Sequence, residues 1–209
     1  MKPRGKPIKW SSEIAYVVGL ITTDGCLSND GRHIIMGSSD ISQLKTFNKC
    51  LNLSNKISET KNNGWAIKPA YRVQFGNVIL YKWLLNIGLM PNKTKRIGAL
   101  KIPSKYFFDF LRGHLDGDGY IRNFQDPVYP NSERLYIIFH SASLKHLKYL
   151  QGQIKNLLDI NSSIMFHSKE FALQYAKKAS LKLLPYLYYN DEVPCLKRKY
   201  KIAQSHLVK

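Results

Sequence analysis

The segment Ile14–Gly25, IAYVVGLITTDG, has a counterpart 94 residues further along the chain in Phe108–Gly119, FDFLRGHLDGDG. Both segments are largely apolar runs of helical length that end in Asp-Gly. A glycine just beyond a helix commonly ends it in a left-handed C-cap, so each segment predicts a helix closed by an aspartate and a glycine. The two copies indicate that the chain contains an internal repeat.

Two more pairs of segments match in the same order after these helices. Ile34–Phe47 is similar to Ile137–Leu150 at a spacing of 103, and Tyr71–Leu85 is similar to Phe171–Pro185 at a spacing of 100. The spacing grows because the second half carries an insertion, QDPVYPNSE, before its matching strand. We therefore assign residues 1–100 to a first repeat and 101–209 to a second, with Met90–Pro103 as the link.

Each half predicts the same series of elements: a helix, two strands, a helix, two strands and a final helix. Asp30-Gly31 is typical of a tight hairpin turn between the first two strands. The expected strands are Cys26–Asn29, Arg32–Ser38, Lys56–Thr60, Ile67–Gly76, Tyr120–Gln125, Arg134–Ser141, Ser162–His167 and Glu170–Ala176. The pattern predicts an α+β protein of two pseudo-symmetric αββαββα repeats, each with an antiparallel sheet.

The chain of 209 residues has a formal net charge of +18, which predicts a polyanionic partner. Its positive residues are spread along the whole chain, so we expect a folded basic surface rather than a basic tail. No apolar run is long enough for a membrane span, and the basic start, MKPRGKPIKW, lacks the apolar stretch of a secretory signal. The three cysteines lack metal-ligand spacing, so we expect a reduced intracellular protein, in the cytoplasm or an organelle matrix.

The ends of the two repeated helices have the chemistry of a cation site. The last carbonyl groups of a helix lack internal partners and carry partial negative charge from the helix dipole. An aspartate added there, Asp24 or Asp118, makes a hard oxygen site suited to Mg²⁺. Gly19 and Gly113 would let the two helices approach closely, so that both aspartates meet. A metal held by paired carboxylates can activate water for phosphodiester hydrolysis.

Val17–Gly25 (VVGLITTDG) and Leu111–Gly119 (LRGHLDGDG) resemble the motif that names the LAGLIDADG homing endonucleases, each at five of nine positions. With the repeated elements, the resemblance covers nearly the whole chain. It implies a monomer whose halves imitate a dimer, with β-sheets that form a saddle on double-stranded DNA. It also implies Mg²⁺-dependent cleavage of both strands across the minor groove, which leaves short 3′ overhangs. No protein-splicing segments flank the chain, so we expect an intron-encoded or freestanding enzyme.

The resemblance further implies which groups hold the metal. The later acid of each motif, Asp24 or Asp118, is the metal ligand in this family. The backbone carbonyls of the preceding residues, Thr23 and Gly117, would complete the shell. The expected cofactor is therefore Mg²⁺ or another divalent cation, bound where the two motifs end.

The remaining motif residues carry further expectations. In this family a lysine near each active site helps to balance phosphate charge. By a loose alignment, the resemblance selects Lys93 and Lys199 from two basic clusters, Lys93/Lys95/Arg96 and Lys197/Arg198/Lys199. The alternative role of these lysines is anchoring of the phosphate backbone or simple solvation. Where the motif has its first acid, the second copy keeps Asp116 but the first has Thr22, which leaves open whether both halves cut equally well. His114 replaces an apolar motif residue, and we interpret it as a packed or solvent-facing helix residue rather than a metal ligand.

Polar side chains alternate with apolar ones along the expected strands. A two-stranded β-ribbon fits the major groove of DNA, where every base pair can be distinguished, and successive strand residues face opposite sides of the sheet. If the apolar residues face the core, their polar neighbours face away and are available to DNA. The candidate DNA-contacting residues are Ser28, His33, Arg72, Gln74, Arg122, Arg134, Tyr136, His140 and Gln174.

Two other functions remain open on the same fold. An RNA-splicing maturase would need a basic surface outside the DNA saddle, which the sequence alone does not locate. A non-catalytic DNA-binding protein is disfavoured because both Asp24 and Asp118 are retained.

Overall fold

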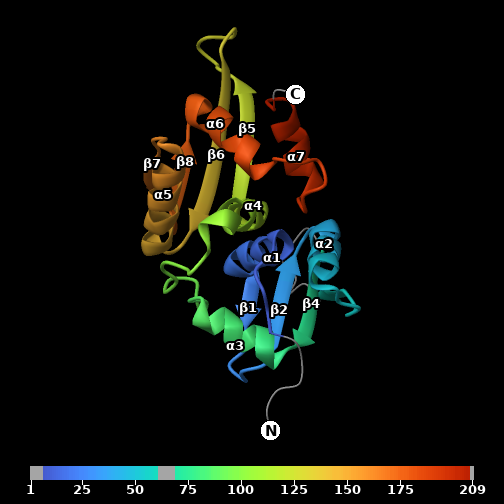
Figure 1. Cartoon of the computed structure of the whole chain (residues 1–209). Helices are drawn as coiled ribbons and strands as arrows, with labels where there is room; N and C mark the ends of the chain where they lie inside the picture. The colour runs from blue at the N-terminus through green and yellow to red at the C-terminus, as the bar shows by residue number, and fades with distance from the viewer. Residues whose placement is uncertain (1–6, 61–68, 208–209) are drawn as a thin grey trace.

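The computed structural model describes residues 7–60 and 69–207, which form two halves that meet at a pair of central helices (Figure 1). Each half repeats the order helix, strand, strand, helix, strand, strand, helix. The helices are α1 (Ser12–Thr23), α2 (Ile41–Leu51), α3 (Val78–Asn86), α4 (Phe107–Asp118), α5 (Leu144–Leu158), α6 (Lys177–Leu187) and α7 (Lys197–Gln204), and a short 3-10 helix, η1 (Ser104–Tyr106), precedes α4. None of the helices in these ranges is long and apolar enough to cross a membrane.

Each half contains an antiparallel sheet, with strand order β1-β2-β4-β3 in the first and β5-β6-β8-β7 in the second. The strands are β1 (Gly25–Leu27), β2 (His33–Ser38), β3 (Ser58–Thr60), β4 (Ala70–Gly76), β5 (Gly119–Gln125), β6 (Glu133–Ser141), β7 (Ser163–His167) and β8 (Glu170–Tyr175). The expected α+β class with two αββαββα repeats is confirmed. The start of the expected strand Ile67–Gly76 lies outside the described residues.

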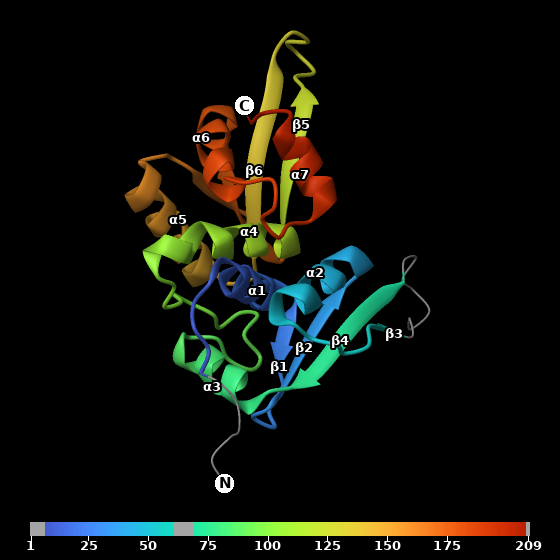
Figure 2. The ribbon, with the colours of Figure 1, turned by 45° about the vertical axis from the view of Figure 1, so that its right-hand side comes forward.

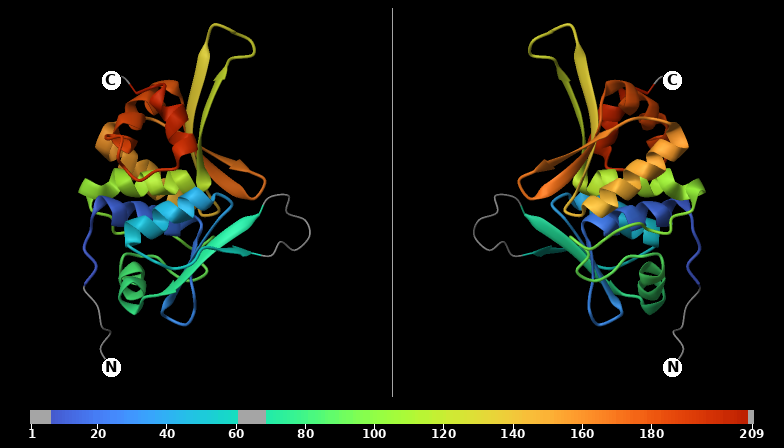
Figure 3. Two further views of the ribbon diagram at one scale, coloured as in Figure 1. Left: turned by 90° about the vertical axis from the view of Figure 1, so that its right-hand side faces the viewer. Right: turned by 90° about the vertical axis from the view of Figure 1, so that its left-hand side faces the viewer.

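Helices cover one face of each sheet and leave the other face open (Figures 2 and 3). In the first half α2 packs against β2 and β4, and α3 packs against β2. In the second half α5 and α6 both pack against β6 and β8. The apolar residues that alternate along the central strands, such as Ile34, Met36 and Val73, are buried under these helices. Their strand neighbours therefore point to the open faces.

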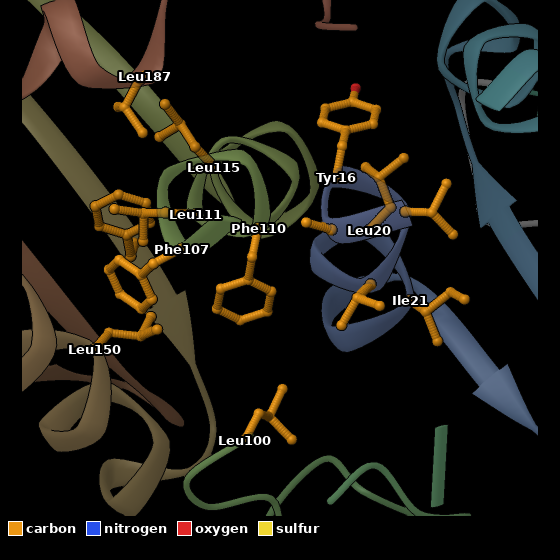
Figure 4. Packing of buried hydrophobic residues seen from close by; sticks show 14 of the residues in the cluster. Tyr16, Leu20, Ile21, Leu100, Phe107, Phe110, Leu111, Leu115, Leu150 and Leu187 are labelled. Atoms are coloured by element: carbon orange, nitrogen blue, oxygen red, sulfur yellow. The ribbon is translucent and has the colours of Figure 1, made fainter. Parts of the chain in front are cut away.

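The two motif helices, α1 and α4, pack side by side at the centre of the molecule (Figure 4). They approach so closely because each has a glycine at the contact. A Cβ atom on Gly19 would lie 2.2 Å from the carbonyl oxygen of Phe110, and one on Gly113 would lie 2.0 Å from that of Tyr16. Around this contact, Tyr16 and Phe110 are themselves fully buried. The helix pair is therefore a backbone-to-backbone interface that joins the two halves.

Replacing Gly113 by alanine is expected to lower the free energy of unfolding by about 3 kcal/mol, the upper end of the cost of overpacking a core. The reason is that the new methyl group would overlap the Tyr16 carbonyl, a backbone atom that cannot rotate away. Gly152→Ala in the middle of α5 is the matched control, because no atom lies within 4 Å of its Cβ position. That variant should gain up to about 1 kcal/mol from helix propensity. Urea denaturation measures both, and equal stability of the two variants would contradict the close helix contact.

The glycines that follow the motif helices do not form the left-handed C-caps expected from the sequence. Gly119 is extended, with φ −108° and ψ 174°, and Gly25 begins β1 directly after Asp24. Both glycines are needed because there is no space for a side chain. A Cβ atom on Gly25 would lie 2.5 Å from the Cα of Ile21, and one on Gly119 would lie 2.8 Å from the carbonyl oxygen of Ile138. The sharp step from helix to strand thus brings each sheet directly onto the end of its helix.

The turn between β1 and β2 is longer than the expected tight hairpin. Residues 28–32 separate the two strands, and the Asp30 carboxylate accepts hydrogen bonds from the backbone N–H groups of Arg32 (3.1 Å) and His33 (3.0 Å). Gly31 has φ +77°, so the glycine of the Asp-Gly pair does occupy a left-handed position.

His114 of α4 is buried and stacks on His146 of α5, with ring centroids 5.2 Å apart. This is the packed alternative that we considered for His114. Burial lowers the pKa of His114 well below its ordinary value and lowers that of His146 to about 4. The Nδ1 atom of His146 lies 2.8 Å from the Gly98 carbonyl, so it carries the proton in the neutral ring. Both rings are therefore neutral in the fold at pH 7.

This pair predicts an acid-sensitive fold. A histidine whose pKa is lower in the folded than in the unfolded state stabilises fully above about pH 6.5, and this stability is lost as pH falls towards the folded pKa. Each histidine contributes a loss on the order of 2 kcal/mol to the free energy of unfolding between pH 7 and 5, while Asp24, whose pKa is raised to about 7, contributes in the opposite direction over this range. His146→Asn keeps an amide donor for Gly98 but does not titrate, so lowering the pH over this range should cost the variant less in melting temperature than it costs the parent. Parallel melting curves for the parent and the variant would refute the assignment.

Candidate active site and nucleic-acid interface

Asp24 and Asp118 lie together where α1 and α4 end. Asp24 is the C-cap of α1, and Asp118 is the last residue of α4. The contact between the helix ends is tight, since a Cβ atom on Gly117 would lie 1.9 Å from Thr23 Oγ1 and 2.9 Å from Asp24 Oδ2. Both aspartates are exposed as residues, although neighbouring groups exclude much of the solvent from their carboxylates. The helix pair thus places two solvent-reachable carboxylates at the junction of the two sheets.

The surroundings raise the pKa values of both carboxylates above their ordinary range. The pKa of Asp24 is raised to about 7, mainly because its carboxylate loses solvent and also because of the charge of Asp118, although the charges of Lys199 and Lys93 lower it. Burial also raises the pKa of Asp118, against the effect of Lys93. Two carboxylates that resist simultaneous ionisation form a site that a cation would stabilise, because a positive charge between them relieves their repulsion.

The two predicted lysines lie at equivalent places under the helix ends. Lys93 Nζ donates to the carbonyl oxygens of Thr23 (3.1 Å) and Gly25 (2.5 Å). Lys199 Nζ donates to the carbonyl oxygens of Leu115 (2.5 Å), Asp116 (2.9 Å) and Gly119 (2.5 Å). Both lysines are buried, and burial lowers the pKa of Lys199 to about 8 and also lowers that of Lys93. These ammonium groups cap the negative ends of the helix dipoles directly beneath the carboxylates.

The donor set fits a hard divalent cation. In the part of the chain that the structure describes, no three histidine, cysteine, aspartate or glutamate side chains gather as a metal cluster. A cation at the helix ends would therefore depend on Asp24 and Asp118, with backbone carbonyls and solvent to fill its shell. The Thr23 carbonyl is one of the two backbone carbonyls expected to bind the cation, and it already accepts a hydrogen bond from Lys93. It would therefore bind a cation through its second lone pair.

The two helix ends differ at the position of the first motif acid. Thr22 is buried, and its hydroxyl donates to the Val18 carbonyl at 2.7 Å within its own helix. Asp116 is buried too, but its Oδ2 accepts from the Tyr16 hydroxyl (2.9 Å) across the helix pair and from the Leu196 N–H (2.7 Å). Burial raises the pKa of Asp116. Asp116 thus ties α4 to α1 and to the segment before α7, and it faces the packed interior.

The sheet register places eight of the nine predicted DNA-contacting residues on the open faces, and Ser28 follows β1 in the turn to β2. Directly opposed residues of an antiparallel pair share one face, and β2 and β4 oppose Ile35 with Gln74 and Gly37 with Arg72. The same alternation carries His33 to this face. In the second half the open face carries Arg122, Arg134, Tyr136, His140 and Gln174. Each open face meets the helix ends that carry Asp24 and Asp118.

Several residues on the open faces were missed by the sequence analysis. Tyr120 stacks on His140 with ring centroids 5.5 Å apart. The Phe124 ring packs against the Arg122 guanidinium, 4.3 Å from the ring centroid, and stacks on the Tyr136 ring, with centroids 6.2 Å apart. The strand alternation that selected Arg122 also selects both of these aromatic residues. They were passed over because an aromatic residue in a strand is more often part of the core.

Some of the predicted DNA-contacting residues already have acidic partners within the chain. Arg134 Nε donates to Asp126 Oδ2 at 2.5 Å. His140 Nδ1 lies 2.9 Å from Glu170 Oε1. His33 Nδ1 contacts the Asp30 carboxylate. DNA that used these side chains would compete with exposed intramolecular contacts, which are individually weak in water.

No protein-family model matches the chain, and no curated protein matches it in sequence. Solved structures do match. The chain is similar to the homing endonuclease I-WcaI bound to its DNA recognition sequence, with a TM-score of 0.65 and 13% identity over 92% of this chain and 87% of that one. It is similar to the LAGLIDADG meganuclease I-AabMI bound to uncleaved DNA, with a TM-score of 0.60 and 14% identity over 92% and 88% of the two chains.

The fold also resembles that of a protein described as full-length DUF199/WhiA from Thermatoga maritima, with a TM-score of 0.57 and 16% identity. The match covers 97% of this chain but only 64% of that one. The chain therefore has the two-repeat LAGLIDADG fold, which confirms the resemblance inferred from its two motifs. At these identities the likeness shows the fold, and the activity has to be argued from the site.

Proposed function

We propose that this chain is a site-specific endonuclease that hydrolyses both strands of double-stranded DNA with a divalent cation, Mg²⁺ being the expected one. The observation that carries the proposal is the meeting of Asp24 and Asp118 at the ends of α1 and α4, between two open sheet faces. A protein that only bound DNA would have no need for two carboxylates where they would repel the phosphate backbone.

In this proposal each part of the chain has a distinct task. When bound, the cation supplies Lewis-acid activation of water and stabilisation of the leaving oxygen. Asp24 and Asp118 hold it in their ionised forms. Lys93 and Lys199 favour those forms, because their positive charges lower the pKa of Asp24. The Gly19 and Gly113 contact keeps the two helix ends in a fixed relation, which positions the carboxylates before DNA arrives.

We further propose that one chain suffices for cleavage of both strands with short 3′ overhangs. Both aspartates, both lysines and both sheets belong to the same polypeptide, so the site is complete in a monomer. A dimer would place a second pair of aspartates elsewhere and would serve no step of this reaction.

A cleavage selection tests the proposal as a whole. Plasmids that carry a randomised insert are incubated with the protein and Mg²⁺, and linearised molecules are recovered and sequenced. We expect one enriched site with short 3′ overhangs and no product in a chelator. Binding selection that enriches a site without any cleavage would support the non-catalytic alternative instead. A preference for structured RNA over every duplex would support the maturase alternative.

Base readout is expected to be local to single side chains on the open faces. Arg72→Ala or Gln74→Ala should relax preference at one or two base pairs, with a loss of about 1–3 kcal/mol of discrimination, and should spare the cleavage chemistry. Both side chains lie on the open face of β4, and β2 separates that strand from β1 and from the end of α1. Lys82→Ala on α3, an exposed residue on the helix-covered side, is the control. If either β4 variant lost all binding yet kept its base preferences, the readout role would be wrong.

A further inference from the structure

The hairpin formed by β5 and β6 is longer than its counterpart in the first half. In the first half β1 and β2 pair from Gly25↔Met36 to Leu27↔Ile34. In the second half β5 and β6 pair from Gly119↔Phe139 to Gln125↔Glu133. The paired ladder therefore continues for four further residue pairs, and the hairpin projects well beyond its own sheet in every view (Figures 1 to 3).

The extended part of this hairpin has a continuous outer surface on the open face. Because opposed residues share a face, Arg122 lies with Tyr136 and Phe124 lies with Arg134. The guanidinium of Arg122 covers Phe124, and Phe124 stacks on Tyr136 at an interplanar angle of 22°. On the same open face of β5, Tyr120 lies between this surface and Asp118 in the sequence. The surface presents two arginines and two aromatic rings, beyond the point where the paired strands of the first-half hairpin end.

The tip of the hairpin is held by its own hydrogen bonds. The Asp126 carboxylate accepts from the backbone N–H groups of Val128 (2.8 Å) and Tyr129 (3.1 Å) and from Arg134 Nε (2.5 Å). Asp126 N–H donates to the Ser132 carbonyl at 2.8 Å. Val128 and Tyr129 are left exposed, at 74% and 65%. The insertion thus builds a supported arm and leaves its apolar tip residues outside the core.

We propose that this arm lengthens the contact with double-stranded DNA on the second half only, so that the target site is asymmetric. The inference rests on the proposed function. A strand advances about 3.4 Å per residue and a DNA duplex about 3.4 Å per base pair, so four additional pairs reach about four base pairs further from the cleavage centre. The partner is DNA because the arm prolongs an arginine-bearing open face that already ends at the paired carboxylates.

The test compares footprints of the full chain with and without the arm. The arm-less variant replaces residues 124–134 with SNDGRH, the sequence of residues 28–33, which comprises the turn after β1 and the first residue of β2. The exchange starts after Asn123 and ends before Leu135, two residues that are directly opposed. This pair lies on the core-facing side of the sheet, as the pair Leu27 and Ile34 does in the first half, so the alternation of core-facing residues is kept. Phe124→Ser is the second variant, since Phe124 lies outside the hydrophobic core and its loss should leave the fold intact.

The probe is a duplex recovered by binding selection from a randomised library, in a chelator so that it stays uncut. Hydroxyl-radical footprinting should show protection that reaches about four base pairs further on one side of the centre than on the other. The arm-less variant should lose roughly two base pairs of that excess, and Phe124→Ser should lose protection at its outer part. Protection over the other half should stay unchanged.

A symmetric footprint of the parent protein, or an unchanged footprint of the arm-less variant, would overturn the inference while leaving the proposed function intact. Absence of any selected duplex or footprint would instead reject the proposed function, and this inference with it.

Discussion

Replacing Asp24 or Asp118 by asparagine is expected to lower double-strand cleavage by about three orders of magnitude or more, while leaving DNA binding largely intact. Asparagine keeps the shape of the side chain and removes the charge that would hold a divalent cation. Because the two helix ends touch through Gly117, Thr23 and Asp24, we expect shared metal ions, so either substitution should impair both strands.

The assay uses a supercoiled plasmid carrying the selected target, with nicked and linear products quantified in Mg²⁺ and in a chelator. Asp159→Asn is the matched control, since Asp159 ends α5 in a left-handed conformation that asparagine tolerates. The control should cut like the parent. Thr22 and Asp116 make the two ends unequal, so slow nicking of one strand is the expected residual activity. Full linearisation by Asp24→Asn, or cutting by the parent in the chelator, would sink the paired-aspartate mechanism.

The same substitution has a stability readout that does not depend on cleavage. The pKa of Asp24 is higher in the fold than in an unfolded chain, so its ionisation opposes folding as pH rises from about 4 towards 7. Asp24→Asn removes this opposition. Without divalent cations the variant should therefore melt above the parent at pH 8, and the difference should shrink as pH falls to 5. A lower melting temperature for the variant at pH 8 would mean that Asp24 is not under electrostatic strain.

The repeated helices, the eight strands and the outward residues were accessible to sequence reasoning because each depends on local periodicity. Two features were not. The Asp-Gly steps were interpreted through turn conformation, whereas Gly25 and Gly119 are needed for space against Ile21 and Ile138, which sequence periodicity cannot show. Helix α7 has few apolar residues and was interpreted only as a basic cluster; its Lys199 instead turns inward onto α4.

Lys93 and Lys199 illustrate the same limit at the site itself. Both positions were selected from a loose alignment, as charges that would face phosphate. The structure places both ammonium groups in the interior, bonded to carbonyls at the ends of α1 and α4 and at the starts of β1 and β5. Their proximity to the aspartates was implied by the family resemblance. Their role as helix caps was not predictable. It depends on which backbone carbonyls lack partners once the chain passes directly from each helix into β1 or β5.

The affinity for DNA is expected to fall by about 10³–10⁵ between about 50 and 200 mM salt, as for a protein that makes six to ten phosphate contacts. The net charge of +18 supports contacts on this scale, even though Lys93 and Lys199 are buried and unavailable to the backbone of DNA. Each cation that neutralises a phosphate releases counterions, so the logarithm of affinity falls linearly with the logarithm of salt concentration.

Two charge-neutralising variants locate this effect on the molecule. Arg122 lies on the open face, whereas Lys148 is exposed on α5, on the helix-covered side of the same sheet. Arg122→Gln should weaken binding more at low salt than at high salt, because it removes a positive charge from the face that meets DNA. Lys148→Gln removes the same charge and should leave the salt response unchanged. Fluorescence anisotropy on the selected duplex measures both slopes. A parent protein whose affinity hardly changed with salt, or a Lys148 variant with the larger loss, would place DNA away from the open sheet faces.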